Sequence, residues 1–333
     1  MNEYKPDYIK IFNKLEQIKN ETWLTESQKW WPDNLFHFTD IINAINILKE
    51  GKLYSRLSLE QQNTNHFDIA SSDVINNTEN IWKNYVRLYF RPRTPTLYRN
   101  EGFRTQSELQ LHSQCPVPIY FVFNSKEILA QETTLFSNGN LAAEAETGND
   151  FSFFDSLPFH KIYHDASLYG YSNGDKRNII FHRHAEVIIP NELTLQHLKF
   201  ISCRSNAEFQ MFKYMLPEDI LKKYSNKIRI ASKALLFYAN WTFIETVDLN
   251  SEELVFHFNP STTSIGKFKA HVELVDKEIN KTYSWEDDNF LANKKLRFNL
   301  DNLNNPSNYE ISLYLNDHIA YKNTFTESTD SPF

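Results

Sequence analysis

Glycine is scarce in this sequence, with only 7 glycines among 333 residues. Loops that cradle phosphates in dinucleotide-binding folds and P-loop enzymes need several closely spaced glycines. Neither a GxGxxG nor a GxxxxGK[ST] motif occurs. These absences argue against both of the common nucleotide-binding loops.

Cysteine is scarcer still. Cys115 and Cys203 are the two cysteines, and they lack the CxxC spacing of a zinc ribbon. We therefore expect neither a disulfide framework nor a structural zinc site, which fits a reducing cytosol. Neither cysteine has a sequence context that would activate a thiol as a nucleophile.

Long apolar runs are also missing. A membrane-spanning helix needs roughly 20 consecutive apolar residues, and the sequence has no such run. The start, MNEYKPDYIK, is charged and lacks the apolar core of a secretory signal. We expect a cytoplasmic protein with no membrane partner.

Charge and aromatic residues are present and unevenly distributed. The net charge is −7, and residues 247–333 hold most of it, with 14 acidic and 8 basic side chains. The 26 Phe and 17 Tyr are enough for a substantial core. One short segment, residues 83–104, is basic, and its single acidic residue is Glu101. Its basic residues are Lys83, Arg87, Arg91, Arg93, Arg99 and Arg104.

The periodicity of the first 228 residues predicts an α+β fold. Strand-like runs outnumber helical ones, and the two kinds do not alternate regularly. Helical spacing covers 6–20, 41–50 (between Asp40 and Gly51) and a helix–proline–helix segment at 205–223. Strands are predicted at 85–90, 119–124 and 178–189, and a polar loop with one short helix at 59–80.

After about residue 228 the pattern changes. Short runs such as EELVFHFNP and YEISLYLND alternate apolar and polar residues, and turn formers separate them. This predicts an antiparallel, immunoglobulin-like β-sandwich. We therefore expect an N-terminal helical extension (1–35), a main domain (36–228) and an accessory sandwich (229–333).

Glu186 stands out in RHAEVIIP, because a carboxylate in an apolar strand is costly unless it is paired. One interpretation is an ion pair with Arg183 or Arg177. The other is that a substrate hydroxyl or a developing cation is its partner. On a strand, the side chains of His182, His184 and Glu186 would share one face, so a metal site is a further interpretation.

Two further segments carry chemistry. In FHFT, His37 and Thr39 project the same way if the segment is extended, and suit hydrogen bonds to a ribose and an amide. In YVRLYFRPRTP, Arg87, Tyr89 and Arg91 would share a face. Basic residues interleaved with aromatics suit stacking on a base while neutralising phosphates.

Taken in order, these segments resemble the DarT family of toxin ADP-ribosyltransferases. FHFTDIINAINILKEGKLYSR resembles the family's His-x-Thr opening, NYVRLYFRPRTPTLY its Tyr-Phe-x-Pro-Arg block, and RHAEVIIP its Ala-Glu block. FSNGNLAAE resembles, more loosely, a turn before the target-facing loop. The resemblance covers about residues 36–216 and implies a mixed sheet core with helices.

The resemblance also implies a function. The family transfers ADP-ribose from NAD to bases of single-stranded DNA, and its members are usually neutralised by an antitoxin. By motif, Glu186 would be catalytic, Tyr89 would lie near the nicotinamide, and His37, Thr39 and Arg93 would contact the cofactor. No metal is implied.

The sequence departs from the family in one respect. A family arginine expected before the Tyr-Phe block has no match in IASSDVINNT, and Arg56 is the nearest upstream candidate for this catalytic position. Arg87 stands where the family usually has a neutral residue. We expect nucleic-acid contacts from Arg87, Arg91, Arg99 and His184.

Three interpretations of function remain open. The first is ADP-ribosylation of a base, with DNA favoured and RNA or a protein side chain as an alternative, within a toxin–antitoxin or phage-defence system. The second is a metal-dependent hydrolase that uses His182, His184 and Glu186. The third is a nucleic-acid-binding protein without catalysis.

Overall fold

The computed structural model describes residues 3–62, 80–105, 107–109, 114–230, 236–292 and 295–327. Most of the loop and the short helix expected at 59–80 lie outside these residues. The chain divides into two compact units. The boundaries near residues 35 and 228 that the sequence suggests stay a prediction.

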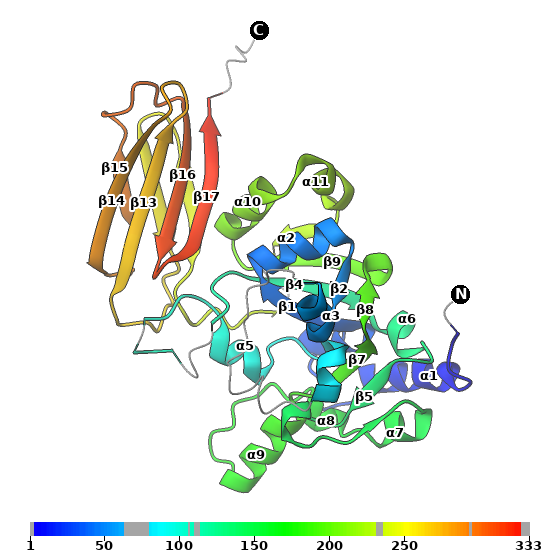
Figure 1. Cartoon of the computed structure of the whole chain (residues 1–333). Coiled ribbons are helices and arrows are strands. Elements are labelled where there is room, and N and C mark those ends of the chain that lie inside the picture. Colours follow the sequence, from blue (N-terminus) through cyan, green and yellow to red (C-terminus); the bar gives the residue numbers. More distant parts are fainter. Residues whose placement is uncertain are drawn as a thin grey trace. The chain divides into compact units, whose positions relative to one another are not determined.

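The first unit comprises residues 1–99, 119–202 and 233–238. Its strands form a sheet in the order β9-β4-β1-β3-β7-β5-β6. Figure 1 labels β9, β4, β1, β7 and β5 of this sheet. The strands are β1 (Asn34–Asp40), β3 (Tyr85–Tyr89), β4 (Pro118–Asn124), β5 (Leu135–Ser137), β6 (Thr147–Gly148), β7 (Glu186–Pro190) and β9 (Leu198–Cys203). A separate pair joins β2 (Lys52–Tyr54) to β8 (Glu192–Thr194).

The centre of this sheet is apolar on both faces. All residues of β4 except the last are buried, as a continuous apolar run with covered faces requires. Strand β3 pairs antiparallel with β1 on one side and with β7 on the other. The strands predicted at 85–90 and 119–124 are confirmed, and the segment around Glu186 and Tyr89 is fixed by the register of β3 on β7.

Helices cover the sheet. They are α1 (Tyr8–Lys19), α2 (Ile41–Glu50), α3 (Arg56–Gln61), α5 (Pro95–Asn100), α6 (Ser125–Leu129), α7 (Phe151–Ser156), α8 (Phe159–Ile162) and α9 (Asn173–His182). The Asp40 side chain accepts a hydrogen bond from the N–H of Ile42, and Gly51 ends α2 in the left-handed conformation. Both ends of α2 therefore lie where the sequence predicted them.

The prediction of a strand at 178–189 is wrong for the first half of that segment. Residues 173–182 form α9, whose start is capped by Ser172 as its hydroxyl accepts from the N–H of Asp175. Strand β7 begins only at Glu186. A short apolar run such as Ile179–Phe181 does not distinguish helix from strand by periodicity, and the polar cap favours the helix.

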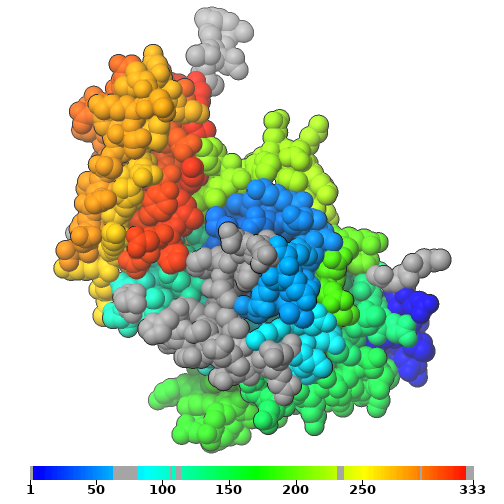
Figure 2. All heavy atoms as spheres, viewed as in Figure 1, coloured from blue at the N-terminus to red at the C-terminus, as the bar shows by residue number. Residues whose placement is uncertain are grey.

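The second unit comprises residues 100–118, 203–232 and 239–333. Two antiparallel sheets, β11-β12-β15 and β14-β13-β16-β17, dominate it. The atoms of residues 268–292 and 295–326, which include the second sheet, are coloured from yellow to red in Figure 2. The rings of Phe256 and Tyr321 lie 5.8 Å apart, and those of Trp285 and Phe298 5.3 Å apart, so aromatic residues join the two sheets. The expectation of antiparallel β-structure after residue 228 is confirmed.

The elements of this unit are α10 (Asn206–Met215), α11 (Glu218–Tyr224), β10 (Ile228–Ile230), β11 (Ile244–Leu249), β12 (Glu253–Phe258), β13 (Phe268–Asp276), β14 (Lys281–Phe290), β15 (Leu296–Asn299), β16 (Asn308–Leu315) and β17 (His318–Thr326). The predicted helix–proline–helix segment corresponds to α10 and α11. Among the described residues, no helix is both long and apolar enough to cross a membrane.

A buried ion group lies at the start of α10. Arg204 donates through Nε to Glu208 Oε1 at 3.1 Å and through Nη1 to Glu101 Oε1 at 3.2 Å. The three side chains are at most 2% exposed. Because two buried carboxyl groups share the guanidinium of Arg204, the three side chains hold one another in place, and loss of Arg204 would leave both carboxyl groups without their cation.

Candidate active site

Glu186 is the first residue of β7 and lies directly opposite Tyr89 in the β3–β7 pairing. Its backbone N–H donates to the Ser137 hydroxyl at 2.8 Å, and that hydroxyl donates to the carbonyl of Gly139, also at 2.8 Å. The start of β7 is therefore tied to the turn that follows β5. This tie fixes where the Glu186 side chain emerges from the sheet.

The Glu186 carboxylate is buried and only partly satisfied. The residue is 3% exposed, and Oε1 lies 3.7 Å from Nη1 of Arg87. Oε2 has no hydrogen-bond partner within the described part of the chain. Burial raises the pKa of Glu186, while Arg87, the Leu141 N–H and the Tyr89 hydroxyl act in the opposite direction. A buried carboxylate with an unused oxygen is a typical feature of a functional site.

The turn over Glu186 has a defined structure. Asn140 accepts from the N–H of Ala142 and so begins a short 3₁₀ helix at Leu141–Ala143. A Cβ on Gly139 would lie 2.2 Å from the Phe181 ring, so only glycine fits there without movement. The His182 Nδ1–H donates to the carbonyl of Asn138 at 2.6 Å. The end of α9 therefore holds this turn in place.

His37 and Tyr89 are uncharged neighbours of this site. The Nδ1–H of His37 donates to the carbonyl of Arg87 at 3.1 Å. Burial lowers the pKa of His37 to about 4, so the ring is neutral at physiological pH and its Nε2 is an acceptor. Burial and the nearby Glu186 raise the pKa of Tyr89, which keeps its hydroxyl protonated and able to donate.

Thr39 completes the strand face that begins with His37. It is buried, and its hydroxyl accepts from the side-chain amide of Asn43 at 3.0 Å. Because β1 is extended over 34–40, His37 and Thr39 project to the same side, as expected from the sequence. Both residues therefore lie on the strand next to β3.

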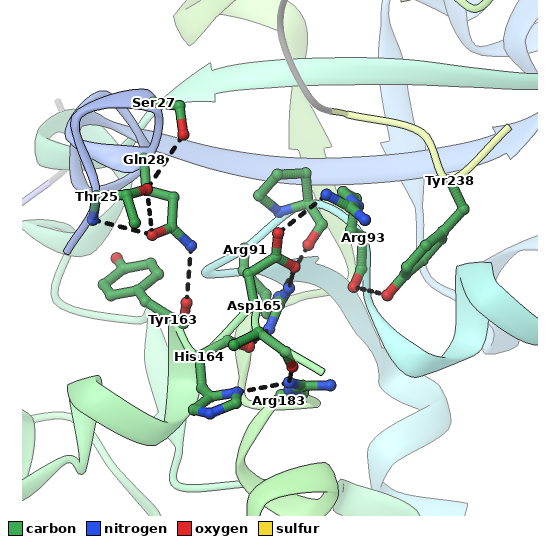
Figure 3. Close-up of polar contacts among 12 residues, drawn as sticks. Thr25, Ser27, Gln28, Arg91, Arg93, Tyr163, His164, Asp165, Arg183 and Tyr238 are labelled. Carbon is green, nitrogen blue, oxygen red and sulfur yellow. Dashed lines mark hydrogen bonds and ion pairs between the residues drawn. The ribbon is translucent and has the colours of Figure 1, made fainter. Parts of the chain in front are cut away.

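Arg91 and Arg93 form a brace around Asp165 (Figure 3). Arg91 donates to one oxygen of Asp165 and Arg93 to the other, the second at 2.9 Å. The Tyr238 hydroxyl donates to the carbonyl of Arg93, whose φ of 52° lies in the left-handed region. The brace joins the turn after β3 to the segment between α8 and α9.

The burial of Arg91 overturns one prediction. Its side chain is 0% exposed, and its nitrogens are bonded to Asp165 and to the carbonyls of Pro92 and His164. Arg91 therefore does not lie on an exposed nucleic-acid surface. The sequence could not reveal this, because its carboxylate partner is 74 residues away along the chain.

Arg183 joins the same group, and sequence reasoning missed this role. It donates to the carbonyl of Ala166 at 2.7 Å and to Nδ1 of His164. Burial, followed by the nearby Arg91, lowers the pKa of Arg183 to about 10. The ion pair considered between Arg183 and Glu186 is wrong, since the cation beside Glu186 is Arg87.

The proposed metal face is also wrong. His182 ends α9, His184 lies in the turn that follows, and only Glu186 belongs to β7, so the three share no strand face. The His184 ring bonds the carbonyl of Ile180 at 2.9 Å and is 7% exposed, so His184 does not lie on an exposed nucleic-acid surface either. In the described ranges no group of three or more potential ligands gathers for a metal.

The remaining predicted residues are accessible. Arg99 is exposed near the end of α5, and Arg56 is partly exposed at the start of α3. Arg87 keeps 26% of its side-chain surface exposed beside Glu186.

Four residues form one cluster, here called the Glu186 cluster. Arg87 pairs with Glu186, Tyr89 lies opposite Glu186 in the sheet, and His37 binds the carbonyl of Arg87.

Comparison with known proteins gives the following matches. The family model described as "DarT: ssDNA thymidine ADP-ribosyltransferase, DarT" matches residues 36–238. Thermus sp. 2.9 DarT in complex with ADP-ribosylated ssDNA is 18% identical, with a TM-score of 0.48, over 62% of this chain and 97% of that one. The same protein in complex with NAD⁺ is 18% identical, with a TM-score of 0.46, over 65% and 100%.

A third solved structure is Thermosipho africanus DarTG in complex with ADP-ribose. It is 16% identical, with a TM-score of 0.45, over 66% of this chain and 54% of that one. No curated protein matches the sequence. The family model spans more than half of the chain and contains every residue of the Glu186 cluster. The protein therefore belongs to the DarT family of ssDNA thymidine ADP-ribosyltransferases.

Proposed function

We propose that this chain transfers ADP-ribose from NAD to a base of single-stranded DNA, with Glu186 as the catalytic residue. The observation that carries the proposal is the buried Glu186 carboxylate, of which Oε2 is without a partner within the described residues. An unused anionic oxygen in an otherwise satisfied strand fits a site for a donor group of the substrate.

The chemistry explains why a carboxylate suits the site. Cleavage of the nicotinamide glycosidic bond passes through an oxocarbenium-like transition state, in which the ribose becomes positively charged. A hydrogen bond from the ribose 2′-hydroxyl to Glu186 strengthens as that charge develops and lowers the barrier selectively. The same carboxylate is suited to accept the proton that the attacking base nitrogen releases.

The neighbours of Glu186 suit the binding of NAD. His37 offers an acceptor at Nε2, and Thr39 offers a hydroxyl on the same side of β1. Tyr89 offers a protonated phenol directly beside Glu186, suited to contact the departing nicotinamide. Arg93 supports this site as part of the brace on Asp165. Arg56 remains a proposal for the additional catalytic arginine.

The target base must be unpaired, because its reactive edge has to reach the ribose carbon. Exposed Arg99 is the proposed contact to the phosphates of the strand. DNA is the favoured target because the family acts on single-stranded DNA. RNA is the alternative to be tested against it.

Mass spectrometry of treated oligonucleotides tests the function. Single-stranded DNA, duplex DNA and RNA of one sequence are incubated with NAD and wild-type protein, Glu186→Gln or Glu192→Gln. The control replaces an exposed glutamate on β8 that pairs with Lys52. We expect one ADP-ribose adduct on single-stranded DNA with wild type and the control, and labelling about 10²–10³ times slower with Glu186→Gln. Equal labelling by Glu186→Gln would remove Glu186 from the reaction.

We also propose that the protein is a cytoplasmic toxin that an antitoxin protein neutralises, in a toxin–antitoxin or phage-defence setting. The support is the family to which the chain belongs and its nucleic-acid chemistry. The β-sandwich of the second unit is the proposed docking surface for a protein partner, because residues 247–333 are acidic and disfavour nucleic acid. Induced expression of wild type should arrest growth and Glu186→Gln should not.

A further inference from the structure

Arg87 lies at the middle of β3 with its Cα opposite Ile188, two residues along from Glu186 on the facing strand. On an antiparallel pair such a diagonal neighbour is within reach of a long side chain. The guanidinium uses this reach, with Nη1 at 3.7 Å from Oε1 of Glu186. The backbone carbonyl of Arg87 is meanwhile fixed by His37.

The two oxygens of Glu186 are therefore not equivalent. Oε1 faces the Arg87 cation, and Oε2 has no hydrogen-bond partner among the described residues. At 3.7 Å the Arg87 cation attracts Oε1 as an ion pair and leaves Oε2 available. Preorganised groups of this kind avoid reorganisation when charge develops in the transition state.

The surroundings make Arg87 the source of compensating charge. His37 on β1 is neutral, Tyr89 on β3 is protonated, and the turn over Glu186 contributes a backbone N–H at Leu141. On the α9 side, His184 bonds a carbonyl and Arg183 belongs to the Asp165 brace. In the described structure, the cation that acts on Glu186 is Arg87.

We propose that Arg87 is a positioning residue of the transfer reaction, which holds one oxygen of Glu186 and keeps the buried carboxylate ionised so that the other oxygen meets the ribose. This inference rests on the proposed function. It differs from the prediction that Arg87 contacts nucleic acid. A phosphate contact would act on oligonucleotide binding, whereas a positioning residue acts on kcat and on its pH dependence.

The first experiment measures kcat and KM from pH 5 to 9.5 for wild type, Arg87→Gln, Arg87→Lys and the control Glu192→Gln. Loss of the Arg87 cation raises the pKa of Glu186, so the acidic limb of the kcat profile moves to higher pH. We expect Arg87→Gln to lose about tenfold or more of kcat near pH 6 and markedly less near pH 9. Arg87→Lys should recover most of the loss, and Glu192→Gln, the exposed control on β8, should leave the kcat profile unchanged.

The opposite pattern would overturn the proposal. If Arg87→Gln raises KM for the oligonucleotide, flattens its salt dependence and leaves the kcat profile unchanged, Arg87 is a phosphate contact. A loss that is equal at all pH values and that Arg87→Lys does not recover would likewise exclude control of the Glu186 charge.

A second experiment does not depend on activity. Thermal unfolding of wild type, Arg87→Gln, Glu186→Gln and the double variant forms a double-mutant cycle. We expect a non-additive shift in Tm at pH 8 that disappears at pH 4, because the raised pKa of Glu186 keeps its carboxyl group protonated at the lower pH. Additive shifts at both pH values would refute the pairing. If wild type neither labels DNA nor releases nicotinamide, the proposed function fails, and the cycle still decides the role of Arg87.

Discussion

Replacing Glu186 with Gln should change stability and activity in opposite directions. Burial raises the folded-state pKa of Glu186 above its unfolded value. Its contribution to stability is therefore fully present below the unfolded pKa and is lost as pH rises through the folded pKa. Above that folded pKa the ionised side chain destabilises the fold, and Glu186→Gln removes the charge while keeping the shape.

The expected gain in stability is modest. Replacing a whole buried ion pair by apolar residues is often neutral or stabilising by about 1–4 kcal/mol. Neutralising Glu186 alone should gain only about 1 kcal/mol, because Arg87 already compensates part of the cost of the charge. Arg87 keeps a quarter of its side chain exposed, so water can solvate it in the variant. A gain of about 1 kcal/mol raises Tm by roughly 2–4 °C in a unit of this size.

The loss of activity should be large. The interaction of Glu186 with the developing positive charge disappears in Glu186→Gln. Removing a single preorganised electrostatic contact costs about 10²–10³ in kcat, and loss of a full charge should reach the upper end of this range. The assay is single-turnover labelling of a single-stranded oligonucleotide at saturating NAD, with melting measured at pH 7 and pH 4.5.

Glu208→Gln is the matched control. It replaces another buried glutamate, whose partner Arg204 is 2% exposed and cannot be solvated. Arg204 keeps Glu101 as a second partner, so the cost should lie below the roughly 3–5 kcal/mol of a fully broken buried pair. This variant should still melt at lower temperature while its folded fraction keeps normal activity. If Glu186→Gln lowers Tm at pH 7 as Glu208→Gln does, Glu186 is a structural residue and the argument from its unused oxygen fails.

Three further outcomes are expected. Ser137→Ala removes the acceptor of the Glu186 N–H and should cost about 1–3 kcal/mol in urea unfolding, together with a lower kcat. Gly139→Ala forces a Cβ against Phe181, so it should lower Tm, and a smaller residue at 181 should recover part of the loss. Arg99→Gln should leave Tm unchanged but weaken oligonucleotide binding. The slope of log K against log salt concentration, measured by filter binding, should fall by about 1. An unchanged slope would show that Arg99 does not contact the phosphates.

Local sequence signals predicted much of the fold. Helix α2 follows from the Asp40 cap and the Gly51 stop, and the strands of the second unit follow from alternation of apolar and polar residues. The order of motifs identified Glu186 and His37 as candidates. These features depend on neighbours within a few residues, which the sequence displays directly.

The remaining features depend on partners far apart in the chain. Arg91 is buried because Asp165 and His164 meet it, and Arg87 reaches Glu186 because β3 pairs with β7 in one particular register. A shift of that register by one residue would point Arg87 away from Glu186. Residue types alone could not decide between an exposed basic strand and these buried or partly buried partners.

The buried contacts of the Asp165 brace and the exposed Arg99 should respond differently to ionic strength. Salt screens exposed charges strongly and buried pairs weakly. The contacts of Arg91 with Asp165 are shielded from solvent and should persist in concentrated salt, whereas attraction of a DNA strand to Arg99 should fade. Raising the salt concentration would therefore leave an assembled centre that has lost its acceptor strand, and water would become the competing acceptor for the ADP-ribosyl group.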